Sequence, residues 1–236
     1  MEIIIAMSDL KAINISFGER NHHFFFEINK NEIVFIIGRN GEGKSTLLLT
    51  IAGLLPLKSG DFIFNGNIIS SGNEVNRIIN GIRIALEDRQ LFPNLTVKEN
   101  IYIGGYQLNK HKRDAKYNEI IELFSDLKIN EKKISKTLSG GQQTQLNIAR
   151  ALMGDTKLLL LDEPSLGLDP VNVNKLIAII REFSLKNDLS VVIVDNNIKL
   201  IKNLANRIIK LENGVMYFAE NIESAIDNGL LNDFYP

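Results

Sequence analysis

Nine consecutive residues of this chain, Gly38 to Thr46, have the types and spacing needed to hold a phosphate group. They read Gly-Arg-Asn-Gly-Glu-Gly-Lys-Ser-Thr and fit the pattern G-x-x-x-x-G-K-[ST]. The glycines let the backbone wrap so that its N–H groups point inward at phosphate oxygens. In such a loop Lys44 reaches the β- and γ-phosphates and the Ser45 hydroxyl is a ligand of Mg²⁺. The candidate nucleotide-binding residues are therefore Gly38, Asn40, Gly41, Gly43, Lys44, Ser45 and Thr46.

The residues on either side of the loop support this interpretation. Ile33–Ile37 is a continuous apolar run, typical of a strand buried on both faces. Leucines and isoleucines after Thr46 recur at helical spacing. A helix that starts at the loop adds its positive N-terminal end to the phosphate site. The alternative, a glycine-rich turn between a core strand and a core helix, does not account for the presence of every fixed residue.

A second stretch places two acids at the end of an apolar run. Residues 157–161 read Lys-Leu-Leu-Leu-Leu, and Asp162 and Glu163 follow directly. At the carboxyl end of a buried strand, Asp162 can hold Mg²⁺ directly or through water. Glu163, one residue further, can orient or activate an attacking water. The alternative is a solvated strand end without chemistry; a phosphate loop in the same chain favours the metal site.

The third stretch is Leu138–Gln142, which reads Leu-Ser-Gly-Gly-Gln and precedes a predicted helix. Ser139, Gly140 and Gly141 would offer a hydroxyl and free N–H groups to an anion. A plain helix N-cap explains Ser139 but not the two glycines that follow it. The phosphate loop already provides one anion site, and nothing within a single chain obviously needs a second one.

The overall composition limits the classes of protein to consider. The chain has 236 residues, 27 basic and 28 acidic, and a formal net charge of −1. It lacks the global basic footprint of a nucleic-acid-binding protein, and without cysteine it has no disulfides or thiol nucleophile. No apolar run approaches the roughly 18 residues of a membrane span, and residues 1–7 do not resemble a signal peptide. We expect a soluble intracellular protein, with residues 1–7 either forming an edge strand or preceding a true start at Met7.

The hydrophobic pattern predicts an α/β fold. We expect strands at 10–17, 24–28 and 82–86, a turn at 59–61, and a hairpin at 62–69 with Asn65-Gly66 at its corner. Residues 94–138 are mostly helical by pattern, with 109–116 as a solvated helix face. A later helix is expected after residue 142, with Leu146, Ala149, Leu152 and Met153 on one face, and further helices at 172–183 and 198–205. Strands are expected at 157–164, where the apolar run ends in two acids, and at 191–194, 207–211 and 215–218.

These three stretches, in this order and spacing, resemble the ATPase subunits of ATP-binding-cassette (ABC) transporters. The resemblance covers almost the whole chain, and the Leu-Ser-Gly-Gly-Gln signature is close to diagnostic. It implies a P-loop NTPase with a RecA-like core, an antiparallel β subdomain and an inserted helical subdomain. It also implies one ABC ATPase domain over 1–236, with the core at about 1–90 and 147–236 and the helical subdomain at about 91–146.

The resemblance also implies ATP and Mg²⁺ as cofactors and a head-to-tail dimer. In this family Ser139, Gly140, Gly141 and Gln142 would face the ATP of a second ABC subunit. Ser165–Asp169 matches the D-loop, which crosses the same interface. Phe17 stands where an aromatic, commonly Tyr, stacks on adenine; a plain core role for Phe17 is the alternative. The helical segment would dock a cytoplasmic helix of a membrane permease at the inner face of the membrane.

Two positions depart from the general family pattern. Glu87 stands where the Q-loop glutamine is usual, and Gln90 is out of register. A carboxylate at 87 can still be a ligand of Mg²⁺. Asn196 stands in place of the switch histidine; its amide can hydrogen-bond the γ-phosphate but cannot carry a proton. The histidines of the chain, His22, His23 and His111, are interpreted as surface or loop residues.

At these two positions the chain resembles one branch of the family, the second ATPase subunit of branched-chain amino acid importers (LivF type), which has relatives for urea and short amides. The partner ATPase would then be non-identical, and an extracytoplasmic solute-binding protein would act through the permeases. The short C-terminal part also resembles this branch, whereas Asp169 is the general ABC residue. The alternatives are the ATPase of another ABC transporter such as an exporter, a soluble non-transport ABC ATPase, and a subunit that hydrolyses little by itself because of Asn196.

Overall fold

The computed structural model describes residues 8–18, 22–70, 73–88 and 90–233. The expected edge strand at residues 1–7 and the choice between Met1 and Met7 lie outside the described residues. Among the described residues, no helix is both long and apolar enough to cross a bilayer.

The phosphate-loop strand lies within a large, mostly parallel sheet. In the described part of the chain this sheet has six strands in the order β10-β9-β3-β8-β7-β6. Their bounds are β3 Ile33–Ile37, β6 Ile82–Ala85, β7 Leu158–Asp162, β8 Ser190–Val194, β9 Arg207–Glu212 and β10 Val215–Ala219. Only β10 runs antiparallel to its neighbour. The loops that follow β3, β8, β7 and β6 therefore leave the sheet at one edge, where nucleotide sites of such sheets form.

A smaller antiparallel sheet of four strands, counted among the described residues, covers one face, in the order β2-β1-β4-β5. Its strands are β1 Ser8–Ser16, β2 Phe24–Asn29, β4 Ser59–Phe64 and β5 Asn67–Ile68. The predicted hairpin is confirmed, with Asn65 and Gly66 at φ 49° and 79° as a tight two-residue turn requires. The predicted turn at 59–61 is wrong, because these residues begin β4. A Cβ on Gly60 would lie 2.3 Å from the carbonyl oxygen of Asn14, so this glycine permits the close approach of β4 to β1.

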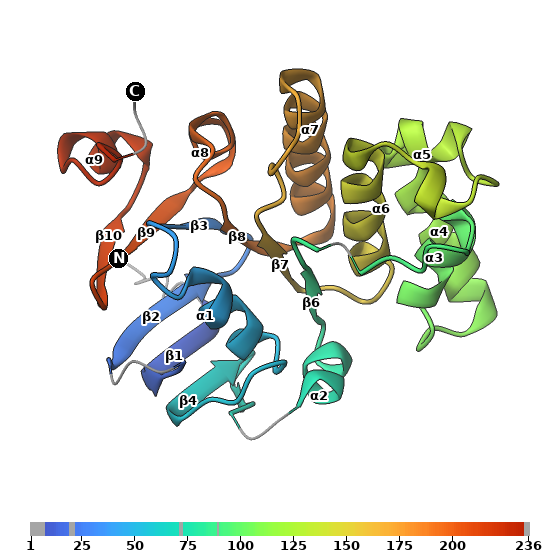
Figure 1. The fold of residues 1–236 in the computed structure, drawn as a ribbon. Coiled ribbons are helices and arrows are strands. Elements are labelled where there is room, and N and C mark those ends of the chain that lie inside the picture. Colours follow the sequence, from blue (N-terminus) through green and yellow to red (C-terminus); the bar gives the residue numbers. More distant parts are fainter. Residues whose placement is uncertain (1–7, 19–21, 71–72, 89, 234–236) are drawn as a thin grey trace, which may run out of the picture.

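Two hydrophobic clusters fill the space between the layers, and Figure 1 shows the arrangement of the layers themselves. One lies between the small sheet, helix α1 (Lys44–Ile51) and the large sheet. The other covers the opposite face of the large sheet with helices α7 (Pro170–Asn187), α8 (Ile198–Leu204) and α9 (Ile222–Asp227). The central strands β3, β7 and β8 are buried along their whole length, as their continuous apolar runs predict.

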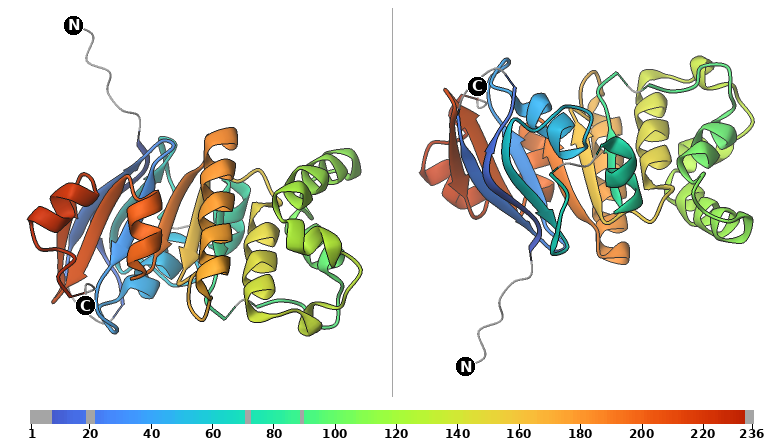
Figure 2. Two further views of the ribbon diagram at one scale, coloured as in Figure 1. Left: turned by 90° about the horizontal axis from the view of Figure 1, so that it is seen from above. Right: turned by 90° about the horizontal axis from the view of Figure 1, so that it is seen from below.

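The helices between β6 and β7 gather at one end of the molecule, away from β9 and β10 (Figure 2). They are α3 (Val97–Gly104), α4 (Lys110–Leu123), α5 (Ser125–Ile129), the short 3-10 turn η1 (Ser135–Thr137) and α6 (Gly140–Leu152). The mostly helical character of 94–138 is confirmed, and residues 109–112 at the start of α4 are exposed. The pattern did not reveal α2 (Glu74–Ile79), which is short and is capped by the Asn73 side chain.

Candidate functional site

The phosphate loop lines a cavity of about 510 Å³ at the carboxyl edge of the large sheet. It connects β3 to α1, and Gly38, Gly41 and Gly43 have φ of 151°, 83° and 94°, which non-glycine residues rarely adopt. The first turn of α1 opens onto the same space. Its lining residues are Asn40, Gly41, Gly43, Lys44, Ser45, Thr46, Glu87, Glu163 and Leu166. The structure thus brings the predicted loop, Glu87 and Glu163 together around one cavity.

Lys44 bends back over the loop that precedes it. Its Nζ donates to the carbonyl oxygens of Gly38, at 2.7 Å, and Arg39, at 3.0 Å. Burial lowers the pKa of Lys44, while the nearby carboxylates of Glu163 and Asp162 oppose that shift. A largely buried ammonium held by two carbonyls is well placed to exchange one of them for a phosphate oxygen.

Ser45 and Asp162 meet across the gap between α1 and β7. The Ser45 hydroxyl donates to Asp162 Oδ1 at 2.9 Å. Burial raises the pKa of Asp162; the Ser45 hydrogen bond opposes this shift and the Glu87 charge adds to it. Hydroxyl and carboxylate oxygens are the ligands that Mg²⁺ prefers, and a Mg²⁺ ion between carboxylates would offset both burial and repulsion. The donor set therefore fits the predicted metal.

Glu163 occupies an unusual backbone conformation directly after β7. Its φ is 44°. Its N–H donates to the carbonyl of Val194, the last residue of β8, at 2.8 Å, and this hydrogen bond holds the turn after β7 against β8. Strained backbone of this kind concentrates at functional sites. Burial and then repulsion by Glu87 raise the pKa of Glu163, which makes its carboxylate a better proton acceptor.

Glu87 lies on the loop after β6 and is exposed at the cavity. It also lines a neighbouring cavity of about 330 Å³ together with Asp162 and Glu163. In the described part of the chain, no group of three or more His, Cys, Asp or Glu side chains could hold a metal alone. A Mg²⁺ here would take one or two carboxylates and the Ser45 hydroxyl as ligands and complete its shell with phosphates and water. Gln90 is exposed and bonds Asp88 instead.

Two residues after β8 connect the sheet edge to the rest of the site. Asn196 hydrogen-bonds both backbone groups of Gly38. Asp195, which the sequence did not single out, accepts from the N–H and the hydroxyl of Ser165, each at 2.9 Å, and is 5% exposed. Burial raises the pKa of Asp195. The signal for it was an acid at the end of a buried strand, the same signal that identified Asp162.

Phe17 lies beside the loop but is mostly covered. It is 6% exposed, its ring packs 5.3 Å from that of Phe24, and it lines a cavity of about 290 Å³ with Gly43 and Thr46. Its position suits both an adenine contact and a core role. His22, His23 and His111 are exposed, as predicted.

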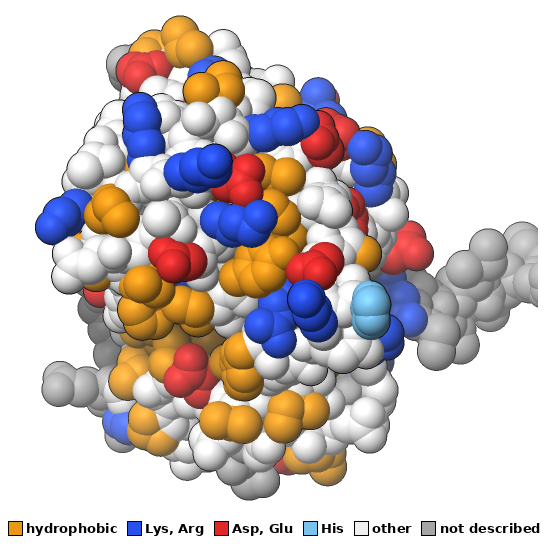
Figure 3. Space-filling model, turned by 90° about the vertical axis from the view of Figure 1, so that its right-hand side faces the viewer, with side chains coloured by type: hydrophobic (Ala, Val, Ile, Leu, Met, Phe, Trp, Pro, Cys, Tyr) orange, Lys and Arg blue, Asp and Glu red, His pale blue; other side chains and the backbone are white. Residues whose placement is uncertain are grey.

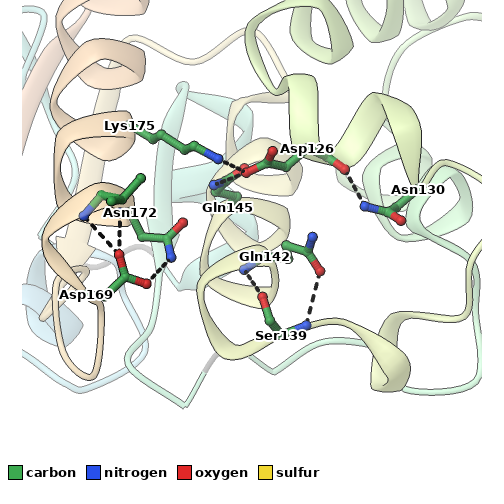
Figure 4. Close-up of polar contacts among 9 residues, drawn as sticks. Asp126, Asn130, Ser139, Gln142, Gln145, Asp169, Asn172 and Lys175 are labelled. Carbon is green, nitrogen blue, oxygen red and sulfur yellow. Dashed lines mark hydrogen bonds and ion pairs between the residues drawn. The ribbon is translucent and has the colours of Figure 1, made fainter.

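The signature lies outside the phosphate cavity. Ser139 caps α6: its Oγ accepts from the Gln142 N–H at 3.4 Å, and Gln142 Oε1 accepts from the Ser139 N–H at 3.1 Å (Figure 4). Ser139 and Gly140 are exposed, whereas Gly141 is buried against α7. None of these residues lines the cavity of the phosphate loop.

The comparisons with known proteins agree with this geometry. The family model described as ABC transporter matches residues 22–166. The chain belongs to the ABC transporter family. It is 36% identical to the high-affinity branched-chain amino acid transport ATP-binding protein BraG of Pseudomonas aeruginosa, over 91% of each chain. It is 32% identical to the probable branched-chain amino acid transport ATP-binding protein LivF of Archaeoglobus fulgidus, over 89% of this chain and 90% of the relative.

Solved structures give the same result for the ABC fold. A nucleotide-free ATP-binding cassette from an ABC transporter superposes with a TM-score of 0.85 at 25% identity, covering 98% of this chain and 99% of the other. The predicted P-loop NTPase fold class is confirmed, and the chain is an ATP-hydrolysing, ATP-binding subunit of the ABC type. Another relative, the glutamate/aspartate import ATP-binding protein GltL of Escherichia coli, is 28% identical over 80% of this chain and 79% of its own length.

Proposed function

We propose that this subunit powers an importer of branched-chain amino acids or related small amides. The observation that carries the proposal is the similarity to BraG along 91% of both chains. Glu87 and Asn196, at the positions where the general ABC residues are replaced, support the same branch. A second candidate is an importer of acidic amino acids, which the similarity to GltL favours.

In the proposed mechanism the loop N–H groups and Lys44 bind the β- and γ-phosphates of ATP. Ser45, Asp162 and Glu87 would hold Mg²⁺, which supplies neutralisation of the charge that develops on the phosphates. Glu163 orients the attacking water and accepts its proton, as its raised pKa favours. Phe17 stacks on the adenine, and Asn196 acts on the loop through Gly38.

The site is completed by a second, non-identical ATPase subunit in a head-to-tail dimer. The exposed N-terminus of α6, with Ser139 and Gly140, would bind the γ-phosphate of the partner's ATP. Its distance from the chain's own phosphate cavity supports this arrangement, because a signature that served its own loop would have to line that cavity. We also infer that the subunit is one ABC domain, with the helices of about 91–146 as a distinct subdomain.

A groove on the helical side would receive a cytoplasmic helix of the permease. It encloses about 310 Å³ between α2, β6, α3 and α6, with an apolar floor that includes Ile78, Phe92 and Ile103. Figure 3 shows hydrophobic side chains gathered over the centre and lower half of this end of the molecule, with basic side chains above and beside them. Arg83 and Arg150 also line the groove, so an acidic residue on the docking helix would complement it. The subunit would then lie peripherally at the cytoplasmic face of the membrane.

The test is purification of the tagged chain from its own membranes in mild detergent, together with uptake by a strain that lacks it. Two different permeases and a second ABC ATPase, with loss of leucine uptake, support the proposal. Loss of glutamate or aspartate uptake alone would favour the second candidate. Recovery of no membrane protein would contradict both. Ile103→Glu should release the permeases, whereas Leu185→Glu, an exposed leucine of α7 outside the groove, should not.

A further inference from the structure

Three helices meet at the carboxylate of Asp126. Asp126 lies in the first turn of α5, and its Oδ2 accepts from Lys175 Nζ of α7 at 2.6 Å and from Gln145 Nε2 of α6 at 3.3 Å (Figure 4). Helix α6 begins with the signature, and α7 follows the segment that contains Glu163. The carboxylate is thus a direct polar link from the helical end of the molecule to the catalytic side.

Asp126 of α5 and Gln145 of α6 are both held in place by their surroundings. The Asn130 amide donates to the Asp126 carbonyl at 2.6 Å, and Gln145 is 4% exposed. The ion pair itself is partly exposed, with 42% of the Lys175 side chain and 24% of the Asp126 side chain accessible. A partly exposed pair of this kind adds little to the free energy of unfolding. Its effect is therefore expected in the orientation of the helices rather than in the stability of the fold.

A second contact lies one helical turn away and involves the signature itself. A Cβ on Gly141 would lie 3.0 Å from Cγ of Asn172, so the bare glycine backbone of α6 lies directly against the first turn of α7. The Asn172 amide is fixed in turn by Asp169, with Nδ2 at 2.6 Å from Oδ2. Gly141 and Gln145 are four residues apart, and Asn172 and Lys175 are three apart, so both contacts lie on facing stripes of the two helices.

We propose that Asp126, through Lys175 and Gln145, is a positioning residue that fixes the orientation of the signature helix relative to the catalytic core. The proposal rests on the proposed function, in which the signature binds the nucleotide of a second subunit. Loss of the link should leave the chain's own phosphate cavity intact, because none of these residues lines it. Turnover in the assembled complex should fall, because the signature would no longer be presented in one orientation.

The variants for the test are Asp126→Asn, Lys175→Met and the charge exchange Asp126→Lys with Lys175→Asp. The matched control is Glu182→Gln with Lys186→Met, which removes a 2.6 Å ion pair that lies within α7 alone. Because the chain has no cysteine, spin labels at Lys132→Cys and Lys199→Cys report the distance between the helical end and α8 by pulsed electron paramagnetic resonance. ATP binding by the isolated chain and turnover by the membrane-purified complex complete the set.

We expect Asp126→Asn and Lys175→Met to broaden the distance distribution and to lower turnover by about fivefold or more. ATP binding by the isolated chain should stay unchanged, the charge exchange should restore both distance and turnover, and the control should match the wild type. An unchanged distance distribution, or a broadened one with normal turnover, would overturn the proposal. A wild-type complex without ATP turnover would instead refute the proposed function, and the distance measurement would still decide whether Asp126 fixes the helix.

Discussion

The Asn196 side chain makes two hydrogen bonds to the backbone of Gly38, the first residue of the phosphate loop. Its Oδ1 accepts from the Gly38 N–H at 3.2 Å, and its Nδ2 donates to the Gly38 carbonyl at 3.0 Å. An amide can satisfy both groups at once, whereas a carboxylate accepts only. The residue in place of the switch histidine thus connects the end of β8 to the loop that would hold the phosphates.

Asn196→Asp should therefore weaken ATP binding. The carboxylate keeps the bond from the Gly38 N–H but places a negative oxygen against the carbonyl, and we expect about a tenfold loss of affinity, or about 1.4 kcal/mol. Asn197→Asp is the matched control, because its Oδ1 only accepts, from the N–H groups of Lys199 and Leu200. Equal affinities of the two variants in a calorimetric titration would show that the Gly38 contact does not matter.

The backbone conformation of Glu163 predicts that a glycine at this position gives a more stable protein than an alanine, which is the reverse of the usual order. With φ at 44°, an alanine keeps the left-handed strain that a glycine avoids. Glu163→Gly should be more stable than Glu163→Ala by about 1 kcal/mol in urea unfolding, although glycine is normally the less stable residue. If the alanine variant were equally or more stable, Glu163 would not be strained.

The raised pKa of Glu163 predicts how stability depends on pH. A carboxyl whose pKa is higher in the folded than in the unfolded chain favours folding at low pH, and this contribution is lost as the pH rises through the folded pKa. Glu163→Gln should match the wild type below the ordinary value of 4.5 and become the more stable protein above it. Urea unfolding of the nucleotide-free chain between pH 4 and 8 measures the difference, and a constant gap across that range would contradict the shift.

The Ser45–Asp162 contact predicts a metal-specific defect. Ser45→Ala removes a hydroxyl that bonds Asp162 and would be a ligand of Mg²⁺. We expect it to weaken binding of ATP in the presence of Mg²⁺ by about tenfold while leaving ATP binding in excess chelator nearly unchanged. An equal loss under both conditions would mean that the hydroxyl serves the loop and not the metal.

The sequence was sufficient to predict those parts of the fold that depend on local residue patterns. The fixed residues around Lys44 predicted the loop, and the apolar runs of β3, β7 and β8 predicted strands, with Asp162 and Glu163 at the carboxyl end of one of them. It failed at 59–61, because the approach of β4 to β1 depends on Asn14, far away in the chain.

Side-chain directions at the site needed the tertiary structure. The pattern indicated an amide at 196 but not that both of its bonds go to Gly38, and it did not reveal that Asp195 holds Ser165. The link from Asp126 to Lys175 joins residues 49 apart in sequence, and no periodicity reports such a pair.

The central claim is that Glu163 drives hydrolysis of ATP bound at the phosphate loop, and Glu163→Gln tests it most directly. In the membrane-purified complex, phosphate release and retained nucleotide are measured together for the wild type and the variant. We predict that the variant binds ATP with unchanged affinity, releases phosphate at least about a hundredfold more slowly, and accumulates as a closed dimer with ATP retained. Turnover at the wild-type rate would remove Glu163 from the mechanism and contradict the account.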